Sequence, residues 1–260
     1  MPGRDSRLDS RLDSWLDSWG DADLASVWPS AAMTSGDARI GIARTRADLI
    51  SVGRLRYERY VAREGKQYGC TDHVGKTFIE PLDRLSLNFF ATVNGRVAGA
   101  VRLVRASDAP ADRHLALLVE AARPADPATT VVNSRFAVRP EMAARALIVP
   151  MFQQVYRSGL LAGARQCLLA TRTELIPLFG KFGFVPLGRT LNDPVAGHLE
   201  ILALDAFDFA HLASVASPYL PIARSLLGRL VDAEDAAGRA LGFAEAAAAS
   251  DSLRPAVVAR

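Results

Sequence analysis

The chain has 260 residues, half of them hydrophobic, which suffices for one core of about 170 to 200 residues with additions at both ends. Its formal net charge of +3 is small and dispersed, which gives no argument for nucleic-acid binding but suits an acidic carrier protein or a nucleotide phosphate. Cys70 and Cys167 lie far apart without metal-ligand spacing, so we expect no disulfide scaffold, no metal site and a cytoplasmic location.

Residues 1–36 form a low-complexity extension that precedes the expected domain. Asp5 to Trp19 repeat a four-residue unit beginning Asp-Ser, which places Leu8, Leu12 and Leu16 on one helical stripe. Frequent Asp and Ser nevertheless favour a segment that stays unstructured until something binds it. No basic region precedes an apolar run, and no apolar stretch reaches about eighteen residues, so we expect a soluble protein without a secretion signal or membrane span.

Apolar periodicity predicts one α/β domain over residues 37–205. Asn94-Gly95 is a strong two-residue hairpin signal, because both central residues of a type I′ turn need a positive φ. The expected elements, in chain order, are a strand at Ala38–Ala43, a helix at Arg46–Ala62, strands at Ser86–Val93 and Arg96–Val104, a helix at Leu115–Ala122, a strand at Thr129–Val138, a helix at Glu141–Leu161, a strand at Gln166–Ala170, a helix at Glu174–Phe182 and strands at Phe184–Leu187 and His198–Leu204. This order predicts a mixed sheet covered by helices.

A helical extension is expected over residues 206–260. Its helices should be interrupted at Pro218 and Pro221, because proline removes a backbone donor and clashes with the preceding turn. The Ala-rich tail should fray after Ala249.

Two segments combine regular structure with a turn that exposes backbone groups. Val131–Glu141 has the pattern of a buried strand that ends in a polar turn and opens a helix. Leu178–Phe184 has the pattern of a short helix that passes through glycine into another strand. In this order the pair resembles the GNAT acyltransferase superfamily.

Charged and aromatic residues form a second, more specific pattern. Its members, in chain order, are Arg56 and Tyr60 on one helix face, Glu80 and Asp83 before the first hairpin strand, Arg102 near the end of the second, and the run Ser134-Arg135-Phe136. Over roughly residues 49–205 the chain resembles the acyl-homoserine-lactone synthases, and more closely their relatives, the N-acyl amino acid synthases.

The resemblance implies a GNAT fold, with a mixed, mostly antiparallel sheet flanked by helices and extra C-terminal helices. It also implies transfer of a fatty acyl group from an acyl thioester, on acyl carrier protein or coenzyme A, to a primary amine. That donor is a co-substrate, so no tightly bound cofactor is expected. The implied partners are the donor and a small amine or peptide acceptor, without nucleic acid.

Carried over residue by residue, the resemblance matches Arg135 to the arginine of the Ser-Arg-Phe motif. Arg56, Tyr60, Glu80, Asp83 and Arg102 match positions of the acceptor site and its support, and His73 lies in the polar loop between them. The alternative is that the charged residues form structural ion pairs between the hairpin and the first helix, because buried charges need partners whatever the function. Asp83 and Arg102 are the foremost such pair.

Two positions depart from the relatives. Val132 stands where the similar synthases have a glutamate that is a candidate base, and Phe179 stands where many GNAT acetyltransferases have a tyrosine acid. The remaining candidates for proton removal are Asn133 or Ser134 through a water molecule, then Glu80, His73 and His198. A strand histidine such as His198 is more often packed than catalytic. Cys70 near His73 is a weak candidate nucleophile, because the resemblance implies direct transfer.

The donor is expected along the strand that ends at Val138. A splayed strand leaves a free N–H near Phe136 to Val138, which would bind the thioester carbonyl oxygen. Phosphates are expected at the start of the following helix, near Ala143, Ala144 and Arg145. Because no glycine occurs there, a carrier-protein arm is favoured over free coenzyme A. Hydrophobic residues that include Phe89 either line an acyl tunnel or simply pack in the core.

The sequence therefore predicts an N-acyltransferase that acts on a primary amine of an amino acid, or of a peptide if the C-terminal helices frame a larger acceptor. Two alternatives stay open. One is a signal synthase of the acyl-homoserine-lactone type, which the missing glutamate disfavours. The other is a non-catalytic acyl-binding or regulatory protein, which the loss of both customary catalytic side chains favours.

Overall fold

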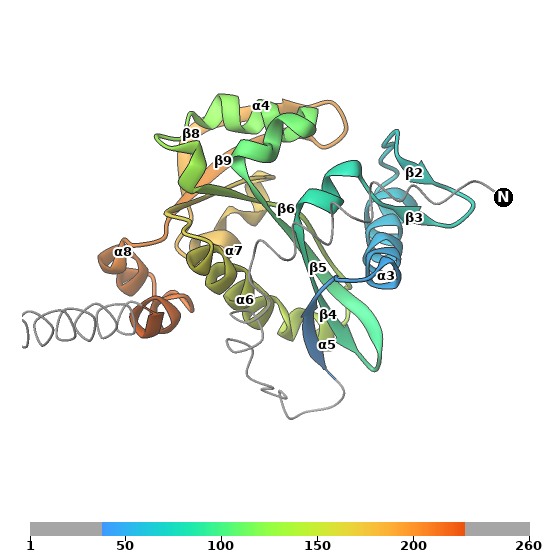
Figure 1. The fold of residues 1–260 in the computed structure, drawn as a ribbon, viewed down its shortest axis with the longest axis horizontal. Coiled ribbons are helices and arrows are strands. Elements are labelled where there is room, and N and C mark those ends of the chain that lie inside the picture. The colour runs from blue at the N-terminus through green and yellow to red at the C-terminus, as the bar shows by residue number, and fades with distance from the viewer. Residues whose placement is uncertain (1–37, 227–260) are drawn as a thin grey trace, which may run out of the picture.

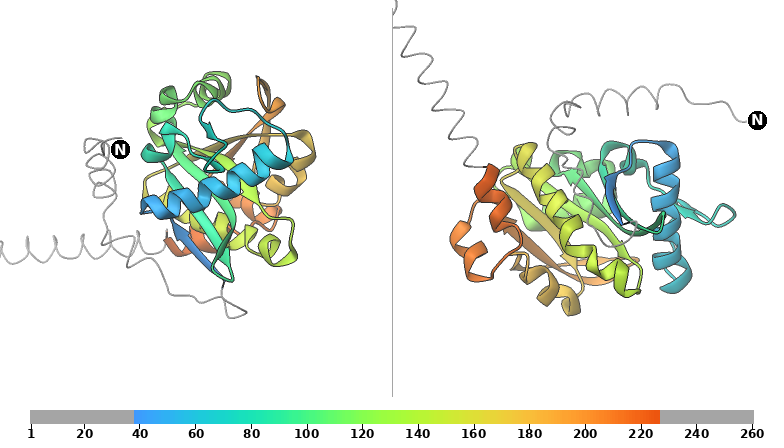
Figure 2. Two further views of the ribbon diagram at one scale, coloured as in Figure 1. Left: turned by 90° about the vertical axis from the view of Figure 1, so that its right-hand side faces the viewer. Right: turned by 90° about the horizontal axis from the view of Figure 1, so that it is seen from below.

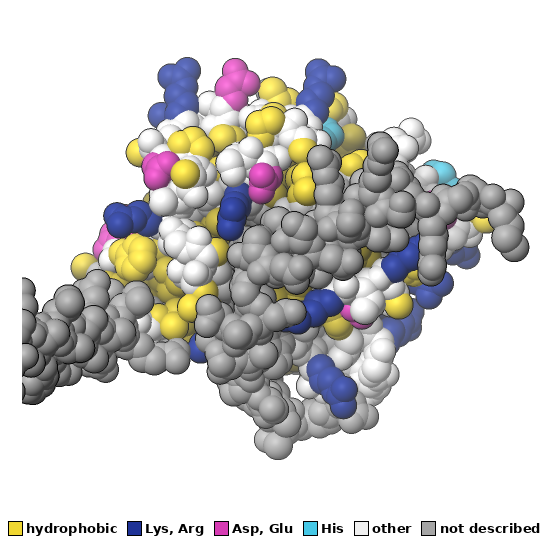
Figure 3. Space-filling view, viewed as in Figure 1, with side chains coloured by type: hydrophobic (Ala, Val, Ile, Leu, Met, Phe, Trp, Pro, Cys, Tyr) yellow, Lys and Arg dark blue, Asp and Glu magenta, His cyan; other side chains and the backbone are white. Residues whose placement is uncertain are grey.

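The computed structural model describes residues 38–226 (Figure 1). The expectations for the N-terminal repeat and for the tail after Ala249 therefore lie outside the described residues, as do the side chains of Met142 and Ala143. None of the helices within 38–226 is both long and apolar enough to cross a membrane. On the face drawn in Figure 3, the basic and acidic side chains of the described residues are dispersed, in keeping with the small net charge.

Seven strands of the described residues form one mixed sheet. Their order across the sheet is β1 (Arg39–Ile42), β4 (Leu87–Val93), β5 (Arg96–Arg105), β6 (Thr130–Val138), β7 (Gln166–Thr171), β9 (Gly197–Asp205) and β8 (Val185–Asp193). Among these pairs only β6 and β7 run parallel, and all the other neighbours are antiparallel. The predicted mixed, mostly antiparallel sheet is confirmed.

Helices cover both faces of the sheet (Figures 1 and 2). The helices are α3 (Arg46–Arg56), which continues as a π-helical turn at Tyr57–Arg63, then α4 (Arg113–Ala122), α5 (Met142–Ala146), α6 (Ile148–Leu161), α7 (Ile176–Gly180) and α8 (Phe209–Ser214). One hydrophobic cluster joins the sheet to α6, α7 and α8, and two others join the opposite face to α3 and α4. Shorter 3-10 helices occur at Pro81–Leu85, Ala106–Ala111, Pro127–Thr129 and Thr173–Leu175.

The predicted hairpin between β4 and β5 is confirmed. Asn94 and Gly95 both have positive φ, at 51° and 73°, as a type I′ turn requires. The turn sets the register in which Val93 faces Arg96, and a register shift between Ala91 and Thr92 then brings Asn88 opposite Arg102. This register brings two polar side chains together on the face that α3 covers.

Several expected elements differ from the structure. The helix expected at Glu141–Leu161 is two helices that meet at Leu147, because Pro150 has no N–H to continue the ladder. The polar loop after α3 contains a small hairpin of β2 (Thr71–Asp72) and β3 (Thr77–Phe78). Strand β8 extends well beyond the expected Leu187. Pro221 does not interrupt a helix but lies in the first turn of the helical residues 220–226, where a missing N–H costs nothing.

Candidate active site

Strands β6 and β7 separate halfway along their length. They pair at Thr130–Val132 and Gln166–Leu168, whereas β6 runs on to Val138 and β7 runs on to Thr171 in contact with β9 alone. A cleft of about 310 Å³ occupies the opening, lined by β6 from Asn133 onward and by β7 from Leu169 onward. The expectation that this strand splays from its neighbour is confirmed.

A β-bulge shapes the β6 side of the cleft. Arg102 faces Ser134 and Ala100 faces Ala137, so β6 carries one residue more than β5 across this interval. Arg135 occupies the bulge with a φ of 53°, a conformation that costs a side-chain-bearing residue about 1–3 kcal/mol. The extra residue sends Phe136 to the α6 face, where its ring packs against Phe152 and Phe179.

A buried network of charges holds the bulge in place. Glu80 accepts two hydrogen bonds from Arg135, at 2.6 Å from Nε and 2.5 Å from Nη2, and a third from Arg102 Nη1 at 2.9 Å. Asp83 accepts from Arg56 Nη1 at 2.7 Å and lies 3.3 Å from Arg102 Nη1. The predicted ion pair between Asp83 and Arg102 is confirmed. Arg56, Glu80 and Asp83 are not among the residues that line the cleft, so this network supports the cleft from behind.

The network keeps both of its carboxylates ionised. Burial opposes ionisation of Glu80, but the hydrogen bonds and charge of Arg135, aided by Arg102, outweigh it and lower the pKa of Glu80. Burial likewise opposes ionisation of Asp83, and the charges of Arg56 and Arg102 outweigh it and lower the pKa of Asp83. A carboxylate whose pKa is lowered and whose oxygens are already engaged is a poor proton acceptor, which places Glu80 in a supporting position.

We expect the network to make stability fall in acid. Because the folded-state pKa values lie below the ordinary values of 4.5 for Glu80 and 3.8 for Asp83, the stabilisation is present above those values and is lost as pH falls through the lowered ones. Urea midpoints measured from about pH 7 to about pH 3 should decrease most steeply below about pH 4. A midpoint that is constant over this range would contradict the assigned ion pairs.

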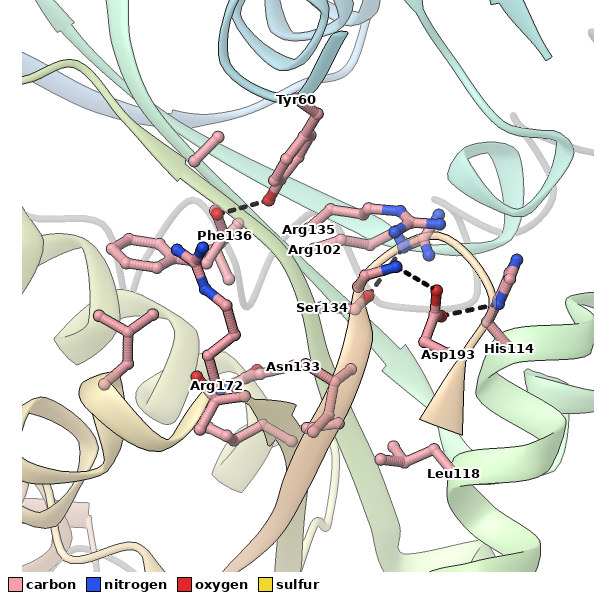
Figure 4. Close-up of a pocket in the computed structure, with 18 of the residues that line it drawn as sticks. Tyr60, Arg102, His114, Leu118, Asn133, Ser134, Arg135, Phe136, Arg172 and Asp193 are labelled. Atoms are coloured by element: carbon pink, nitrogen blue, oxygen red, sulfur yellow. Dashed lines mark hydrogen bonds and ion pairs between the residues drawn. The ribbon is translucent and has the colours of Figure 1, made fainter. Parts of the chain in front are cut away.

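Polar groups of the cleft either hold the bulged strand or lack a hydrogen-bond partner (Figure 4). The Tyr60 hydroxyl, on the π-helical turn, donates to the Phe136 carbonyl at 2.5 Å, and burial raises the pKa of Tyr60 so that it stays a donor. Ser134 Oγ accepts from Arg102 Nε at 3.0 Å. Of the residues that line the cleft, Asn133, Arg102 and His114 each have a buried polar atom without a hydrogen-bond partner, namely Oδ1, Nη2 and Nδ1. Since buried polar atoms are normally paired, Asn133 Oδ1 and Arg102 Nη2 suit a bound ligand.

A contact between a histidine and an aspartate, which sequence reasoning missed, borders the same cleft. His114 Nδ1, in the first turn of α4, lies 2.8 Å from Asp193 Oδ2 at the end of β8. The other carboxylate oxygen of Asp193 accepts from the backbone N–H groups of Val195 at 2.7 Å and Ala196 at 2.6 Å. Asp112 caps α4 by accepting from the His114 N–H, which fixes the start of the helix. No local motif marks this pair, because its members meet only through packing of α4 on β8.

The remaining candidates fall into two groups. Phe136 and Val138 line the cleft, as does Phe152, one of the hydrophobic residues expected either to line an acyl tunnel or to pack in the core; Arg172, which the sequence did not single out, lines it too. The others lie elsewhere: Phe89 is fully buried in the core, Ala144 is buried in α5, Arg145 is exposed on α5, His73 contacts the Tyr57 hydroxyl at 3.3 Å, and His198 contacts Asn192 on the surface. Phe89 therefore packs in the core and does not line this cleft, and Ala143 contributes a position whose side chain is not described.

A mixed sheet whose one described parallel pair opens beside a bulge, with helices on both faces, defines the acyl-CoA N-acyltransferase or GNAT fold. Comparison with known proteins agrees with this class. Residues 51–205 match the family described as N-acyl amino acid synthase FeeM, and the chain belongs to that family. It is an N-acyltransferase, an enzyme that transfers an acyl group to an amine.

Solved structures share the fold at low sequence identity. FeeM, an N-acyl amino acid synthase from uncultured soil microbes, is 17% identical with a TM-score of 0.54, over 70% of this chain and 98% of its own. MesI, a CoA-dependent acyl-homoserine lactone synthase, is 20% identical with a TM-score of 0.53, over 73% and 95%. TofI, solved with an inhibitor and MTA, is 21% identical with a TM-score of 0.52, over 70% and 98%. No curated protein matches the chain.

Proposed function

We propose that this enzyme transfers a fatty acyl group from a phosphopantetheine thioester to the amine of a free amino acid. The observation that carries the proposal is the opening between β6 and β7. Strand edges that lack a neighbour present backbone N–H and C=O groups, and a pantetheine arm has amide groups that pair with such an edge. The arm would therefore lie along Asn133 to Val138 as an additional strand.

The cleft has a polar side and an apolar side, which suits a thioester joined to a fatty chain. Phe136, Phe152, Leu175 and Phe179 contribute hydrophobic lining from β6, α6, the 3-10 helix Thr173–Leu175 and α7. Each methylene buried there would contribute about 0.8 kcal/mol, so chain length should strongly affect affinity. The polar side carries Arg102 Nη2 and Asn133 Oδ1, to which we assign hydrogen bonds with ligand oxygen and ligand N–H.

The size of the cleft favours a small acceptor. Ligand pockets range from about 300 to about 1,000 Å³, and this one, at about 310 Å³, is at the lower end. No described residue beyond Leu199 lines it, so the described C-terminal helices do not frame a larger acceptor. The described part of the C-terminal extension therefore gives no support to a peptide acceptor.

The reaction forms a C–N bond and breaks a C–S bond. The neutral amine attacks the thioester carbonyl carbon, the carbonyl oxygen takes the negative charge, the nitrogen loses one proton, and the thiolate leaves as the carbonyl re-forms and takes up a proton to become the thiol. We assign stabilisation of that oxygen to backbone N–H groups near Phe136 to Val138. A thiolate is a good leaving group, which is compatible with Phe179 at the position where many relatives have a tyrosine acid.

For the donor we propose a carrier protein in preference to free coenzyme A. The segment Arg139–Ala146 has no glycine, and α5 has only five residues, so close backbone approach to a pyrophosphate is poor. Arg139 is already engaged with Glu58 and the Val97 carbonyl. The exposed Arg145, with Ala143 and Ala144 beside it, is the proposed contact for the single phosphate of the carrier-protein arm.

The test supplies purified enzyme with a set of acyl-carrier proteins and acyl-coenzyme A thioesters of graded chain length. The acceptors are pooled amino acids, a lysine-containing peptide and SAM, which is present in a structure of the related synthase BjaI. Mass spectrometry should detect N-acyl amino acids, formed faster from the carrier-protein donor. An acylated peptide or an acyl-homoserine lactone as the main product would reject the proposed acceptor, and faster transfer from coenzyme A would reject the proposed donor.

A further inference from the structure

We propose that His114 accepts the proton of the attacking amine and that Asp193 positions its imidazole ring. This role deepens the proposed function and rests on acyl transfer in the cleft between β6 and β7. It assigns a base to an enzyme that has Val132 where the similar synthases have their candidate glutamate.

His114 is the histidine that the fold brings to the cleft. All four histidines lie within the described residues, and of these only His114 lines the cleft. His73 and His198 lie on exposed surfaces with partners of their own, and His211 contacts the Gly183 carbonyl. Imidazole is suited to taking up and releasing a proton near neutral pH, which an amine nucleophile requires.

The other candidate bases are engaged or outside the cleft. Glu80 is committed to Arg135 and Arg102 and does not line the cleft. Ser134 Oγ already accepts a hydrogen bond from Arg102 and is not basic. Of the two carboxylates that line the cleft, Glu64 is paired with Lys66 at 2.9 Å, and the other is Asp193 itself.

The charge of Asp193 favours one tautomer of His114. Two backbone N–H groups occupy Asp193 Oδ1, and Oδ2 lies 2.8 Å from His114 Nδ1. This contact lacks hydrogen-bond geometry in the structure, but a carboxylate so close to Nδ1 favours a proton on that nitrogen and leaves the lone pair on Nε2. No described residue makes a hydrogen bond to either ring nitrogen, and Figure 4 shows the second nitrogen turned away from Asp193. The His114 side chain is 27% exposed, against 8% for Asp193, so the base is reachable and its carboxylate is sheltered.

The proton that the amine loses passes through His114 to the departing thiolate. The amine nitrogen forms its bond to the carbonyl carbon and gives one proton to His114 Nε2. The C–S bond then breaks, and the imidazolium returns that proton to the departing thiolate, which leaves as a thiol. Asp193 stays ionised throughout and stabilises the transient imidazolium.

The test compares His114→Gln with the wild-type enzyme, with Arg113→Gln as the matched control. Arg113 is the preceding residue, is exposed and does not line the cleft, so its variant should retain wild-type turnover. With saturating thioester and amino acid, His114→Gln should lose about 100-fold or more in kcat, with little change in the KM for thioester. The rise of kcat with pH near neutrality should also disappear.

The pH profile separates a base from a structural contact. The other titratable or charged groups that line the cleft are Arg59, Tyr60, Glu64, Lys66, Tyr68, Arg102, Arg135, Arg172 and Asp193. These groups stay in place in the His114 variant. If His114 served only as a structural contact between α4 and β8, the folded variant would keep the rise of kcat with pH near neutrality. That result would overturn the proposal. A kcat within about threefold of wild type would overturn it as well.

Asp193→Asn provides a second variant in case His114→Gln does not fold. The Asp193→Asn variant should have a kcat about tenfold or more below that of wild type. The rise of its kcat with pH should move to lower pH, because the imidazolium loses its counter-charge. A rise of kcat at the same pH as in the wild type would count against the positioning role of Asp193. Wild-type turnover on the same substrates is measured first, so that failure of the proposed function is seen separately from failure of the proposed base.

Discussion

Arg135→Ala is expected to abolish amide formation and to destabilise the fold. Arg135 makes two hydrogen bonds to Glu80 from a bulge position with positive φ, so its loss removes the restraint on the bulge and leaves a buried carboxylate short of its main partner. Breaking a buried ion pair from one side costs about 3–5 kcal/mol, a large part of the 5–15 kcal/mol that holds a typical domain together. Turnover and urea unfolding measured on the same preparation test both effects.

Two further variants separate the support of the bulge from general stability. Arg84→Ala removes an exposed arginine of the 3-10 helix that contains Asp83 and should leave turnover and the urea midpoint unchanged. The double variant Arg135→Ala with Glu80→Gln removes the unpaired charge and should recover part of the lost stability without recovering activity. Unchanged turnover in Arg135→Ala would refute the place assigned to this residue.

Ala170→Trp is expected to close the cleft and to lose thioester binding. Ala170 lies on β7 beyond the last residue paired with β6, is partly exposed, and lines the cleft. An indole ring at this position would occupy the space in which the pantetheine arm is proposed to lie. Affinity for the thioester should fall by about 100-fold or more, which corresponds to about 2.7 kcal/mol.

The control for this change is Ala170→Ser, which keeps the side chain small and should retain turnover. Thermal unfolding of both variants shows whether the larger side chain fits without disrupting the sheet, since overpacking costs about 1–3 kcal/mol. Thioester binding at wild-type affinity by a folded Ala170→Trp enzyme would show that the arm does not use the opening between β6 and β7. The proposed function would then lose the observation that carries it.

The sequence pattern was sufficient to predict an element whose conformation depends only on the residues within it. The hairpin at Asn94-Gly95 was predictable because the turn type follows from two residues that tolerate positive φ. The break at Leu147 is equally local, because Pro150 lacks an N–H, although the apolar spacing runs through it without interruption. The β2–β3 hairpin was not predictable, since two-residue strands carry no periodicity.

The candidate site likewise has residues that the sequence identified and residues that only the structure identified. Residues of the buried network were identified by their type and order, because charged residues flanking buried strands need partners. The sequence does not indicate that Arg102 and Arg135 line the cleft while Glu80 lies behind it, where three hydrogen bonds engage its carboxylate. His114 and Asp193 carry no motif and meet only because α4 packs beside the end of β8.

By itself the sequence determined the α/β class, the order along the chain of the seven strands of the large sheet, the hairpin turn and the charged residues that must be paired. Those features follow from side-chain periodicity and from the conformations that single residues allow, which act within a few positions along the chain. Tertiary structure alone decided where β6 leaves β7, the bulge at Arg135, and the meeting of His114 with Asp193. Strand register, bulges and cleft walls depend on strands and helices that are distant in sequence. Long-range contacts stabilise them, and the pattern of neighbouring residues does not reveal such contacts.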